Sequence, residues 1–305
     1  MADFRTLLEL TTAIPDEDAA IAHFIAIRWK DGAFCPYCNG RKVYTFADKR
    51  THKCAASECG KRFSIKVGTV FEATKVPLRR WLMAIWLLTS HKKGVASTTL
   101  ARDIGVTQKT AWLMLHRLRE AATTKSFNGP PSGTVEVDET FVVGKERYKY
   151  ASKRLGDTKG GKGKAVVFGM VQRDGELRAM VVKDRTAATV QGIIGKHVAP
   201  GANVMTDEHT GYAGLQGRYN HHTANHARGE YVRHFTLHTQ TIDGAWSLLK
   251  RQIIGIHHFV TTKHLGRYVA EATWRYNRRT AGEGFRVDML IAGSDGRLTY
   301  KALIA

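Results

Sequence analysis

The sequence lacks long apolar runs, and its 305 residues include only 6 prolines. No stretch of about 18 consecutive apolar residues occurs, so we expect no helix that crosses a membrane. The first residues, MADFRTLLELTTAIPDED, also lack the basic segment and the long apolar run of a secretory signal. With 43% hydrophobic residues and little proline, the chain is expected to fold. Because it lacks a secretory signal and a membrane helix, we expect it to reside in the cytoplasm.

Cysteine is scarce as well, because all 4 cysteines lie between positions 35 and 59 and the 246 residues that follow contain none. They form two pairs, CPYC and CAASEC, separated by 15 residues, and the second pair encloses four residues where two are usual. Such clustering suits a zinc ion held by four thiolates better than a disulfide scaffold. The predicted zinc ligands are Cys35, Cys38, Cys54 and Cys59.

Two alternatives to this zinc site stay open. The four cysteines can be unrelated buried thiols, or His52 can replace one of them as a ligand, although a surface position is more typical of such a histidine. Gly40 and Gly60 follow the two pairs, where a tight turn needs a permissive backbone. The turns therefore favour two metal-binding loops.

Acidic residues are outnumbered, with 27 of them against 47 lysines and arginines, which gives a formal net charge of +20. A protein this basic is expected to bind a polyanion, because each phosphate that it neutralises releases a counterion. A generally solubilising surface is the alternative, but +20 is well beyond what solubility requires. Residues 144–164 carry eight lysines and arginines against two acids, which is typical of a solvated loop and, beside an acidic site, would help to steer DNA.

The pattern of apolar residues predicts a chain of several α+β domains. Asp16–Trp29 and the segment after Pro77 show helical spacing, whereas the residues between them, up to about Val70, contain turn residues and short β-like runs. Two more helical patterns precede the breaker SFNGPPSG at 126–133, which we interpret as an interdomain linker. Beyond it come β-rich runs, and long helices are expected from about Thr241. The predicted parts are an N-terminal helical segment (1–32), a zinc ribbon (33–72), a helical region (73–128), a mixed β-sheet domain (129–290) and a C-terminal tail (291–305).

A helix-turn-helix is predicted within Val95–Arg119, VASTTLARDIGVTQKTAWLMLHRLR. Gly105 allows a sharp turn after the first helix, and Thr107 can cap the second. The first turn of the second helix then faces solvent, where a recognition helix presents side chains to DNA bases. An ordinary helical hairpin is the alternative, and the nearby basic residues favour DNA binding. The candidate DNA contacts here are Gln108, Lys109, Thr110 and Arg117.

Three acidic residues stand where strand and helix patterns would present them. Asp138 lies in the strand pattern VEVDET, whose alternation places Glu136 and Asp138 on one face and Glu139 on the other. Asp207 ends the strand pattern NVMTD, and Asp243 begins a helix after a gap of 35 residues. Cutting and joining phosphodiesters by in-line displacement uses two hard cations held by carboxylates. Any one of these aspartates alone would more often be a turn former or a helix cap, so the assignment depends on the three together.

Longer motifs carry a resemblance to a known family. They are FCPYC, KRFS leading to GTVF, and PLRRW in the first half, then VEVDETFVVGK, TDEHTGY, HTQTIDGAWSLLKR and HLGRYVAEATWRYNRR. Over Ile14–Arg279 the chain resembles DDE transposases of bacterial insertion sequences, of the branch with an N-terminal zinc ribbon. The resemblance implies an α+β multidomain fold in which the zinc ribbon and helix-turn-helix precede an RNase-H-like mixed β-sheet domain flanked by helices.

The same resemblance implies a metal site and DNA contacts. Two Mg²⁺ or Mn²⁺ ions would be held by Asp138 and Asp207 as the first two ligands, with Asp243 at the third position. On the helix of the third acid, Lys250 lies two turns away on the same face and would contact DNA, and Arg251 follows it.

Two positions depart from the family pattern. The third acid in this branch is commonly Glu, in a pattern like T-x-x-I-E-x-x-W, and here it is Asp243. Gln240, three residues earlier, stands where Asn is common. We expect Asp243 to bind metal, and the amide oxygen of Gln240 is the alternative third ligand.

The resemblance predicts an enzyme that binds the terminal inverted repeats of an insertion sequence, cleaves the DNA and transfers the strands, in the nucleoid region of a bacterial cytoplasm. Its expected partners are the double-stranded transposon ends and target DNA, and joining two ends implies a homodimer or a larger assembly. A DNA-binding regulator, or a domesticated transposase with weakened catalysis, is the alternative. It is favoured most by Asp243, which stands where the family commonly has Glu. A generic RNase-H-like nuclease fits less well, since it would not need two additional DNA-reading modules.

Overall fold

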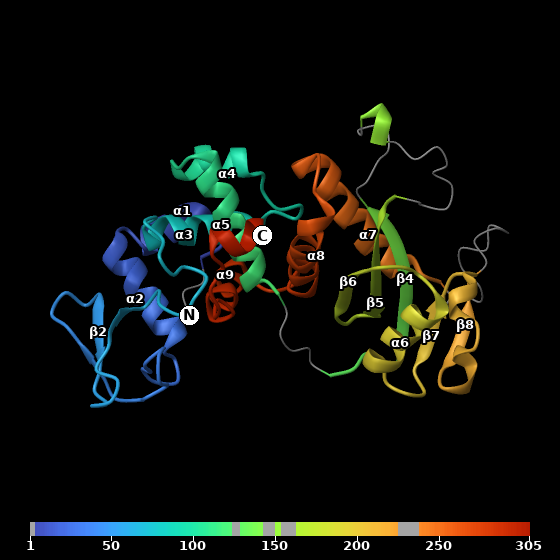
Figure 1. Ribbon diagram of the computed structural model, residues 1–305, viewed down its shortest axis with the longest axis horizontal. Helices are drawn as coiled ribbons and strands as arrows, with labels where there is room; N and C mark the ends of the chain where they lie inside the picture. The colour runs from blue at the N-terminus through green and yellow to red at the C-terminus, as the bar shows by residue number, and fades with distance from the viewer. Residues whose placement is uncertain (1–3, 124–128, 143–149, 154–162, 225–237) are drawn as a thin grey trace. The chain divides into compact units, whose positions relative to one another are not determined.

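Figure 1 shows the computed structural model of the chain, which describes residues 4–123, 129–142, 150–153, 163–224 and 238–305. The chain divides into two compact units: unit 1 comprises Met1–Thr123 with Thr280–Ala305, and unit 2 comprises Thr124–Arg279. Over the described ranges, no helix is both long and apolar enough to span a membrane. Residues 126–128 of the linker expected at 126–133, and most of the basic run at 144–164, lie outside these ranges.

Unit 1 begins with two helices and a small antiparallel sheet of strand order β1-β2-β3. These elements are α1 (Leu7–Ala13), α2 (Glu17–Arg28), β1 (Val43–Thr45), β2 (Thr51–Cys54) and β3 (Arg62–Ser64). The Asp16 side chain caps α2 by accepting a hydrogen bond from the Ala19 N–H at 2.8 Å. The helix after Asp16 and the three β-like runs are as the sequence predicts, and α1 is an additional helix.

Three further helices of unit 1 follow the pattern predicted from the sequence. They are α3 (Leu78–Ser90), α4 (Ser97–Ile104) and α5 (Gln108–Ala121). Gly105 ends α4 in the left-handed conformation, with φ +65°. The Thr107 side chain caps α5 by accepting a hydrogen bond from the Thr110 N–H at 3.2 Å. The two helices and the turn expected within Val95–Arg119 are therefore present.

The last residues of the chain complete unit 1. They form α9 (Glu283–Ala292) and α10 (Tyr300–Ile304), and the apolar face of α9 packs against α2 and α3. The Val70 N–H also donates to the Ser294 carbonyl at 2.9 Å. This differs from the division expected from the sequence, which assigned 129–290 to one domain and 291–305 to a tail. The reason is that the partners of α9 lie near the start of the chain, a pairing that no local pattern reveals.

Unit 2 contains a five-stranded sheet of order β6-β5-β4-β7-β8. Strand β4 pairs antiparallel with β5, which pairs antiparallel with β6, whereas β7 is parallel to both β4 and β8. The strands are β4 (Thr134–Val142), β5 (Ala165–Gln172), β6 (Leu177–Val182), β7 (Asn203–Thr206) and β8 (Asn220–Thr223). The helices are α6 (Ala187–His197), α7 (Gln240–Gln252) and α8 (Thr262–Asn277), with a π-helical turn at Ile253–His257 and short 3-10 helices at Ala151–Lys153, Thr210–Tyr212 and Leu215–Gly217.

The two faces of this sheet are covered by different helices (Figure 1). Val137 and Phe168 pack with residues of α6 in one buried cluster. Val167 packs with Trp246 of α7 and Leu265 of α8 in the other. A mixed sheet with this strand order and helices on both faces is RNase-H-like, so the fold class predicted from the sequence is confirmed. Because β4 is the central strand, its polar side chains meet a helix on each face.

Candidate functional site

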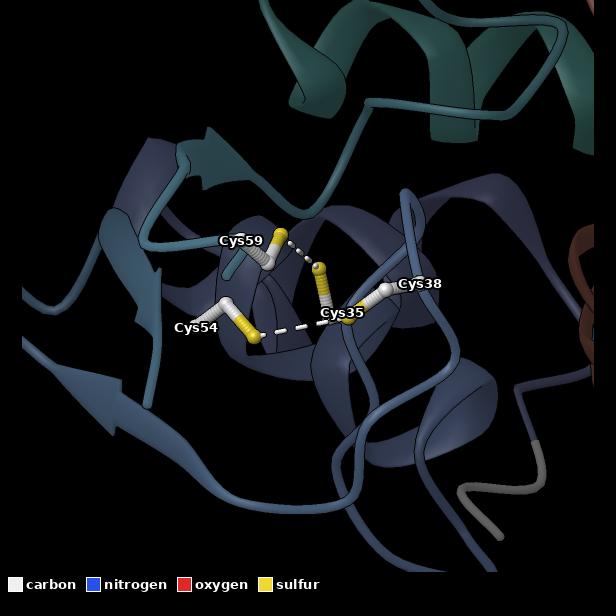
Figure 2. A group of neighbouring side chains, drawn as sticks. All are labelled: Cys35, Cys38, Cys54 and Cys59. Atoms are coloured by element: carbon white, nitrogen blue, oxygen red, sulfur yellow. Dashed lines mark hydrogen bonds between the residues drawn. The ribbon is translucent and has the colours of Figure 1, made fainter. Parts of the chain in front are cut away.

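The four cysteine side chains of unit 1 point toward one another (Figure 2). Their sulfur atoms all lie within 4.8 Å of one another; those of Cys35 and Cys59 are 3.8 Å apart, and those of Cys38 and Cys54 are 3.6 Å apart. Over the part of the chain that the structure describes, this is the only group of three or more possible metal ligands gathered so closely. The cluster therefore fits a tetrahedral thiolate site for one ion.

Two turns bring these sulfur atoms together. In the first, the Cys35 N–H donates to the Gly40 carbonyl and the Asn39 N–H donates to the Cys35 carbonyl, both at 2.9 Å. The left-handed residue of this turn is Asn39, with φ +58°, and not Gly40. Gly40 is favoured by close packing instead, since a Cβ there would lie 3.3 Å from the Cys38 sulfur. In the second turn Gly60 has φ +54°, as the sequence predicts.

Hydrogen bonds from the backbone also favour the thiolate form of Cys35. Burial opposes ionisation of this thiol, but the N–H groups of Tyr37 and Cys38 and the neighbouring sulfur atoms outweigh it and lower the pKa to about 7. Thiolate is the form that binds metal ions. His52 does not belong to the cluster. It is fully buried rather than at the surface, and its Nδ1 forms a hydrogen bond with the Thr45 hydroxyl at 3.1 Å.

The second group of candidate residues lies on and around β4, the central strand of unit 2. Val137 packs on the α6 side, whereas Glu136 and Asp138 form hydrogen bonds with residues of α7. Glu139 points to the α6 side and accepts a hydrogen bond from the Tyr212 hydroxyl. The alternation predicted for this strand is therefore correct.

Asp207 is brought beside Asp138 by the parallel pairing of β4 with β7. The register pairs Glu136 with Met205, and continuing it by two residues places Asp207 opposite Asp138. The Asp207 carboxylate accepts a hydrogen bond from the His209 N–H at 3.0 Å, which orients it. Two aspartates that the sequence separates widely are thus neighbours, one on β4 and the other directly after the adjacent strand β7.

Helix α7 meets Asp138 through Trp246. The Trp246 Nε1–H donates to Asp138 Oδ2 at 2.8 Å. Gly169 pairs with Asp138 on the adjacent strand β5, and a Cβ at this glycine would lie 2.5 Å from the Trp246 ring. Glycine is therefore required where the indole approaches the sheet. Neither Trp246 nor Gly169 was predicted as a site residue. The family pattern, with a tryptophan three positions after the third acid, was the signal for Trp246.

Asp243 lies in the first turn of α7 and is exposed. Its Oδ2 accepts a hydrogen bond from the Thr239 hydroxyl at 3.4 Å. Among the described residues, the carboxylates of Asp138, Asp207 and Asp243 do not form a group with ligand oxygens all within 4.8 Å of one another. The three carboxylates are thus not gathered as closely as the four cysteine sulfur atoms. The other candidates on α7 are also exposed, and these are Gln240, Lys250 and Arg251.

The pKa of Asp138 is raised to about 7. Burial is the largest cause, and the negative charges of Glu139, Asp207 and Asp243 add to it. The acids are therefore near enough to repel one another, and gathering them is costly unless a cation compensates their charge. Neighbouring carboxylate oxygens of this kind suit a hard divalent ion such as Mg²⁺ or Mn²⁺.

An open groove of about 520 Å³ borders the first turn of α5 in unit 1. Tyr300 of α10 stands at this groove and is 56% exposed. It could not be found from the sequence, because α10 comes far later in the chain than α5. The residues that line the groove are Gln108, Lys109, Thr110, Trp112, Leu113 and Tyr300.

Arg117 is a correction to the predicted DNA contacts. Its side chain is buried, and its guanidinium group donates to the carbonyl groups of Leu298 at 3.1 Å and Glu72 at 3.0 Å. Position 117 therefore falls on the packed face of α5, where a cation can be held only by internal acceptors. Arg117 joins the C-terminal segment to the rest of unit 1 and does not face DNA.

Comparison with known proteins connects both parts of the chain with mobile DNA elements. Residues 131–277 match the ISXO2-like transposase domain, and residues 15–62 match the transposase zinc-ribbon domain. A protein of Halobacterium salinarum described as "Uncharacterized protein in transposable element ISH50" is 28% identical over 239 residues, which cover 74% of this chain and 79% of that protein.

Two solved structures show more distant similarity. One is a chain of the simian T-cell lymphotropic virus intasome in complex with PP2A regulatory subunit B56 gamma, with a TM-score of 0.28 and 16% identity over 58% of this chain. This chain spans less than two thirds of that protein, 63%. The other is the Mos1 strand transfer complex, with a TM-score of 0.25 and 13% identity over 75% of this chain and 82% of that chain.

We expect the purified chain to contain one zinc ion held by the four cysteines. Cys54→Ser should lose the ion and unfold the β1-β2-β3 sheet, because binding of the metal stabilises so small a sheet. Elemental analysis of the wild type and the variant measures this. His52→Asn is the matched control, since His52 is buried on the same strand but outside the cluster, and it should keep its zinc. A wild type that contains no zinc and whose thiols titrate freely would contradict the assignment.

The raised pKa of Asp138 predicts that stability depends on pH. An aspartate of the unfolded chain titrates near pH 4, so between about pH 4 and pH 7 the folded chain keeps a proton that the unfolded chain has lost. Without added divalent ions, the free energy of unfolding should therefore fall as the pH rises through this window. Asp138→Asn should stabilise the chain on the order of 2 kcal/mol at about pH 8 and have little effect at about pH 4.

Urea unfolding at the two pH values measures this difference. Asp184→Asn is the control with the opposite sign, because hydrogen bonds from Thr189 and Thr186 lower the pKa of Asp184, so its loss should destabilise the chain at pH 8. An Asp138→Asn variant that is no more stable than the wild type at pH 8 would contradict the raised pKa.

Proposed function

Because the chain belongs to the insertion-sequence transposases that combine a zinc ribbon with a DDE transposase domain, we propose that it binds the terminal inverted repeats of its element and cleaves and transfers DNA strands with divalent metal ions. The observation that carries this proposal is the parallel register that sets Asp207 opposite Asp138. The charge of Asp243 also acts on Asp138. Neighbouring acids are what metal-dependent phosphodiester chemistry requires.

In this proposal, Asp138, Asp207 and Asp243 hold two Mg²⁺ or Mn²⁺ ions. Ions held there would supply activation of the attacking hydroxyl and stabilisation of the leaving oxygen. Trp246 holds Oδ2 of Asp138, which leaves Oδ1 available as a ligand. Because the pKa of Asp138 is about 7 without metal, this carboxyl group releases a proton when a cation binds, and activity should fall in acid.

The DNA contacts of the proposal come from both units. The first turn of α5, with Gln108, Lys109 and Thr110 beside the groove, reads the transposon ends. Lys250 and Arg251, both exposed on α7, contact the phosphates near the acids. A net charge of +20 strengthens all of these contacts at low salt. Water is the nucleophile of the first step and a DNA 3′-hydroxyl that of the second, and joining two ends takes place in a homodimer or larger assembly.

A regulator that binds DNA without cleaving it is the second candidate. It is favoured by one observation: Asp243 is exposed, and its carboxylate is not gathered closely with those of Asp138 and Asp207 in the described residues. In that case the ribbon and α5 retain their role, while the acids no longer hold two ions. Cleavage assays separate the two candidates.

We expect Asp138→Ala and Asp207→Ala each to reduce cleavage of DNA that carries the element's ends by at least about a hundredfold. Binding to the same DNA should be nearly unchanged, because other residues hold the DNA. A gel assay with Mg²⁺ or Mn²⁺ measures cleavage, and Asp184→Ala, outside the acidic group, should retain activity. A variant at 138 or 207 that cleaves at a rate near the wild type would disprove the metal assignment. A wild type that binds ends and cleaves with neither metal would favour the regulator.

Lys109→Ala should weaken binding to end DNA by about tenfold, because Lys109 lies on the exposed first turn of α5 at the groove. The dissociation constant is measured at one fixed salt concentration, since electrostatic binding depends strongly on salt. Lys183→Ala is the control: its side chain is 83% exposed and belongs to unit 2, whereas α5 belongs to unit 1. Equal effects of the two substitutions would mean that α5 does not read the ends.

A further inference from the structure

Glu136 lies on β4 two residues before Asp138, and its side chain is completely buried. A buried carboxylate is costly unless an opposite charge and hydrogen bonds compensate it. Arg173 supplies the charge, since its Nε–H donates to Glu136 Oε1 at 2.8 Å. Burial of the Glu136 carboxylate is therefore compensated by Arg173. The other contacts of Glu136 indicate its role.

The other contacts of Glu136 are directed at the first turn of α7. The N–H groups of Thr241 and Ile242 donate to Oε2 at 2.8 and 3.0 Å. The Thr241 hydroxyl donates to Oε1 at 2.9 Å. Thr239, at the N-cap position of α7, forms no side-chain cap hydrogen bond. A carboxylate from the central strand therefore caps this helix in place of its own N-cap residue, and its negative charge faces the positive end of the helix dipole.

Arg173 extends this attachment to the residue before the N-cap. Its second terminal nitrogen donates to the His238 carbonyl at 2.9 Å. His238 Nδ1 also lies 3.4 Å from Glu136 Oε1. The chain that enters α7 and the first turn of α7 are thus both bound to one buried ion pair.

Asp243 follows Ile242 directly, and Trp246 one turn later donates to Asp138. Glu136 and Asp138, on the same face of β4, therefore hold α7 at two points about one helical turn apart, and Asp243 lies between these points. Since Asp243 itself is exposed, the position of its carboxylate relative to Asp138 depends on how firmly this turn is fixed.

We propose that Glu136 is a positioning residue for the metal site: by capping α7 it sets the Asp243 carboxylate against Asp138 and Asp207 without binding metal itself. This inference rests on the proposed function, because it assumes that the three aspartates hold divalent ions. Loss of the cap frees the first turn of α7, so metal affinity weakens while binding of end DNA does not change.

The test is a calorimetric titration of the full zinc-loaded chain with Mn²⁺. Glu136→Gln, which keeps the shape but removes the charge, should weaken Mn²⁺ binding by about tenfold. Asp184→Asn is the matched control, because Asp184 accepts a hydrogen bond from the Thr186 N–H at 3.1 Å before α6 and is not one of the acids whose charges raise the pKa of Asp138. It removes a carboxylate at a helix start in the same unit and should leave Mn²⁺ affinity unchanged. An equal loss of affinity in both variants, or none in Glu136→Gln, would overturn the positioning role.

A double-mutant cycle shows whether Glu136 acts through Asp243. Asp243→Ala alone should weaken Mn²⁺ binding, and adding Glu136→Gln should weaken it little further, because the positioned carboxylate is already absent. Fully additive losses would contradict the proposal. Asp138→Ala distinguishes failure of the proposed metal site from failure of the positioning role. If Asp138→Ala leaves Mn²⁺ affinity unchanged, the proposed metal site is wrong. If Asp138→Ala abolishes Mn²⁺ binding and Glu136→Gln has no effect, only the positioning role is wrong.

Thr241→Val serves if Glu136→Gln does not fold. It removes only the hydroxyl that donates to Glu136 and leaves the buried ion pair with Arg173 in place. The folded variant should bind Mn²⁺ about twofold or more weakly than the wild type. An affinity equal to that of the wild type would overturn the role of the cap.

Discussion

The attachment of helix α7 to strand β4 is the constraint on which the acidic site of unit 2 depends. Backbone pairing alone sets Asp138 beside Asp207, because the parallel register of β4 and β7 fixes both. Asp243, the third aspartate, lies on a helix, so no backbone pairing between strands fixes its position. The position of Asp243 depends instead on how α7 is attached to the sheet. Trp246 of α7 donates a hydrogen bond to Asp138, and the lack of a side chain at Gly169 allows the indole to approach.

Unit 1 is organised by long-range contacts of a different kind. Its cysteine cluster is local in sequence, whereas its helical core includes α9 and α10 from the end of the chain. The buried Arg117 guanidinium group donates to the Leu298 carbonyl and joins these two parts. Unit 2 is therefore an insertion, in sequence, within unit 1. The core of unit 1 cannot be complete until α9 and α10 have been synthesised.

The sequence predicts those features that depend on short-range patterns. The cysteine spacing, the alternation along β4, and the helix cap at Thr107 are all read from neighbouring residues. Arg117 was assigned wrongly, because its partners lie in segments far away in the sequence. For the same reason Glu136 received no role, since its partners in α7 come about a hundred residues later. The metal-binding role of Asp243 and the alternative at Gln240 stay predictions.

The most direct test of this account is a comparison of cleavage of end-bearing DNA by variants of the first turn of α7, in Mg²⁺ and in Mn²⁺. Asp243→Ala should lose activity as completely as Asp138→Ala, because both aspartates hold the ions. Asp243→Glu should retain or raise activity, since the longer side chain restores the residue common in the family. An active Asp243→Ala together with an inactive Gln240→Ala would contradict the account and assign the third ligand to Gln240.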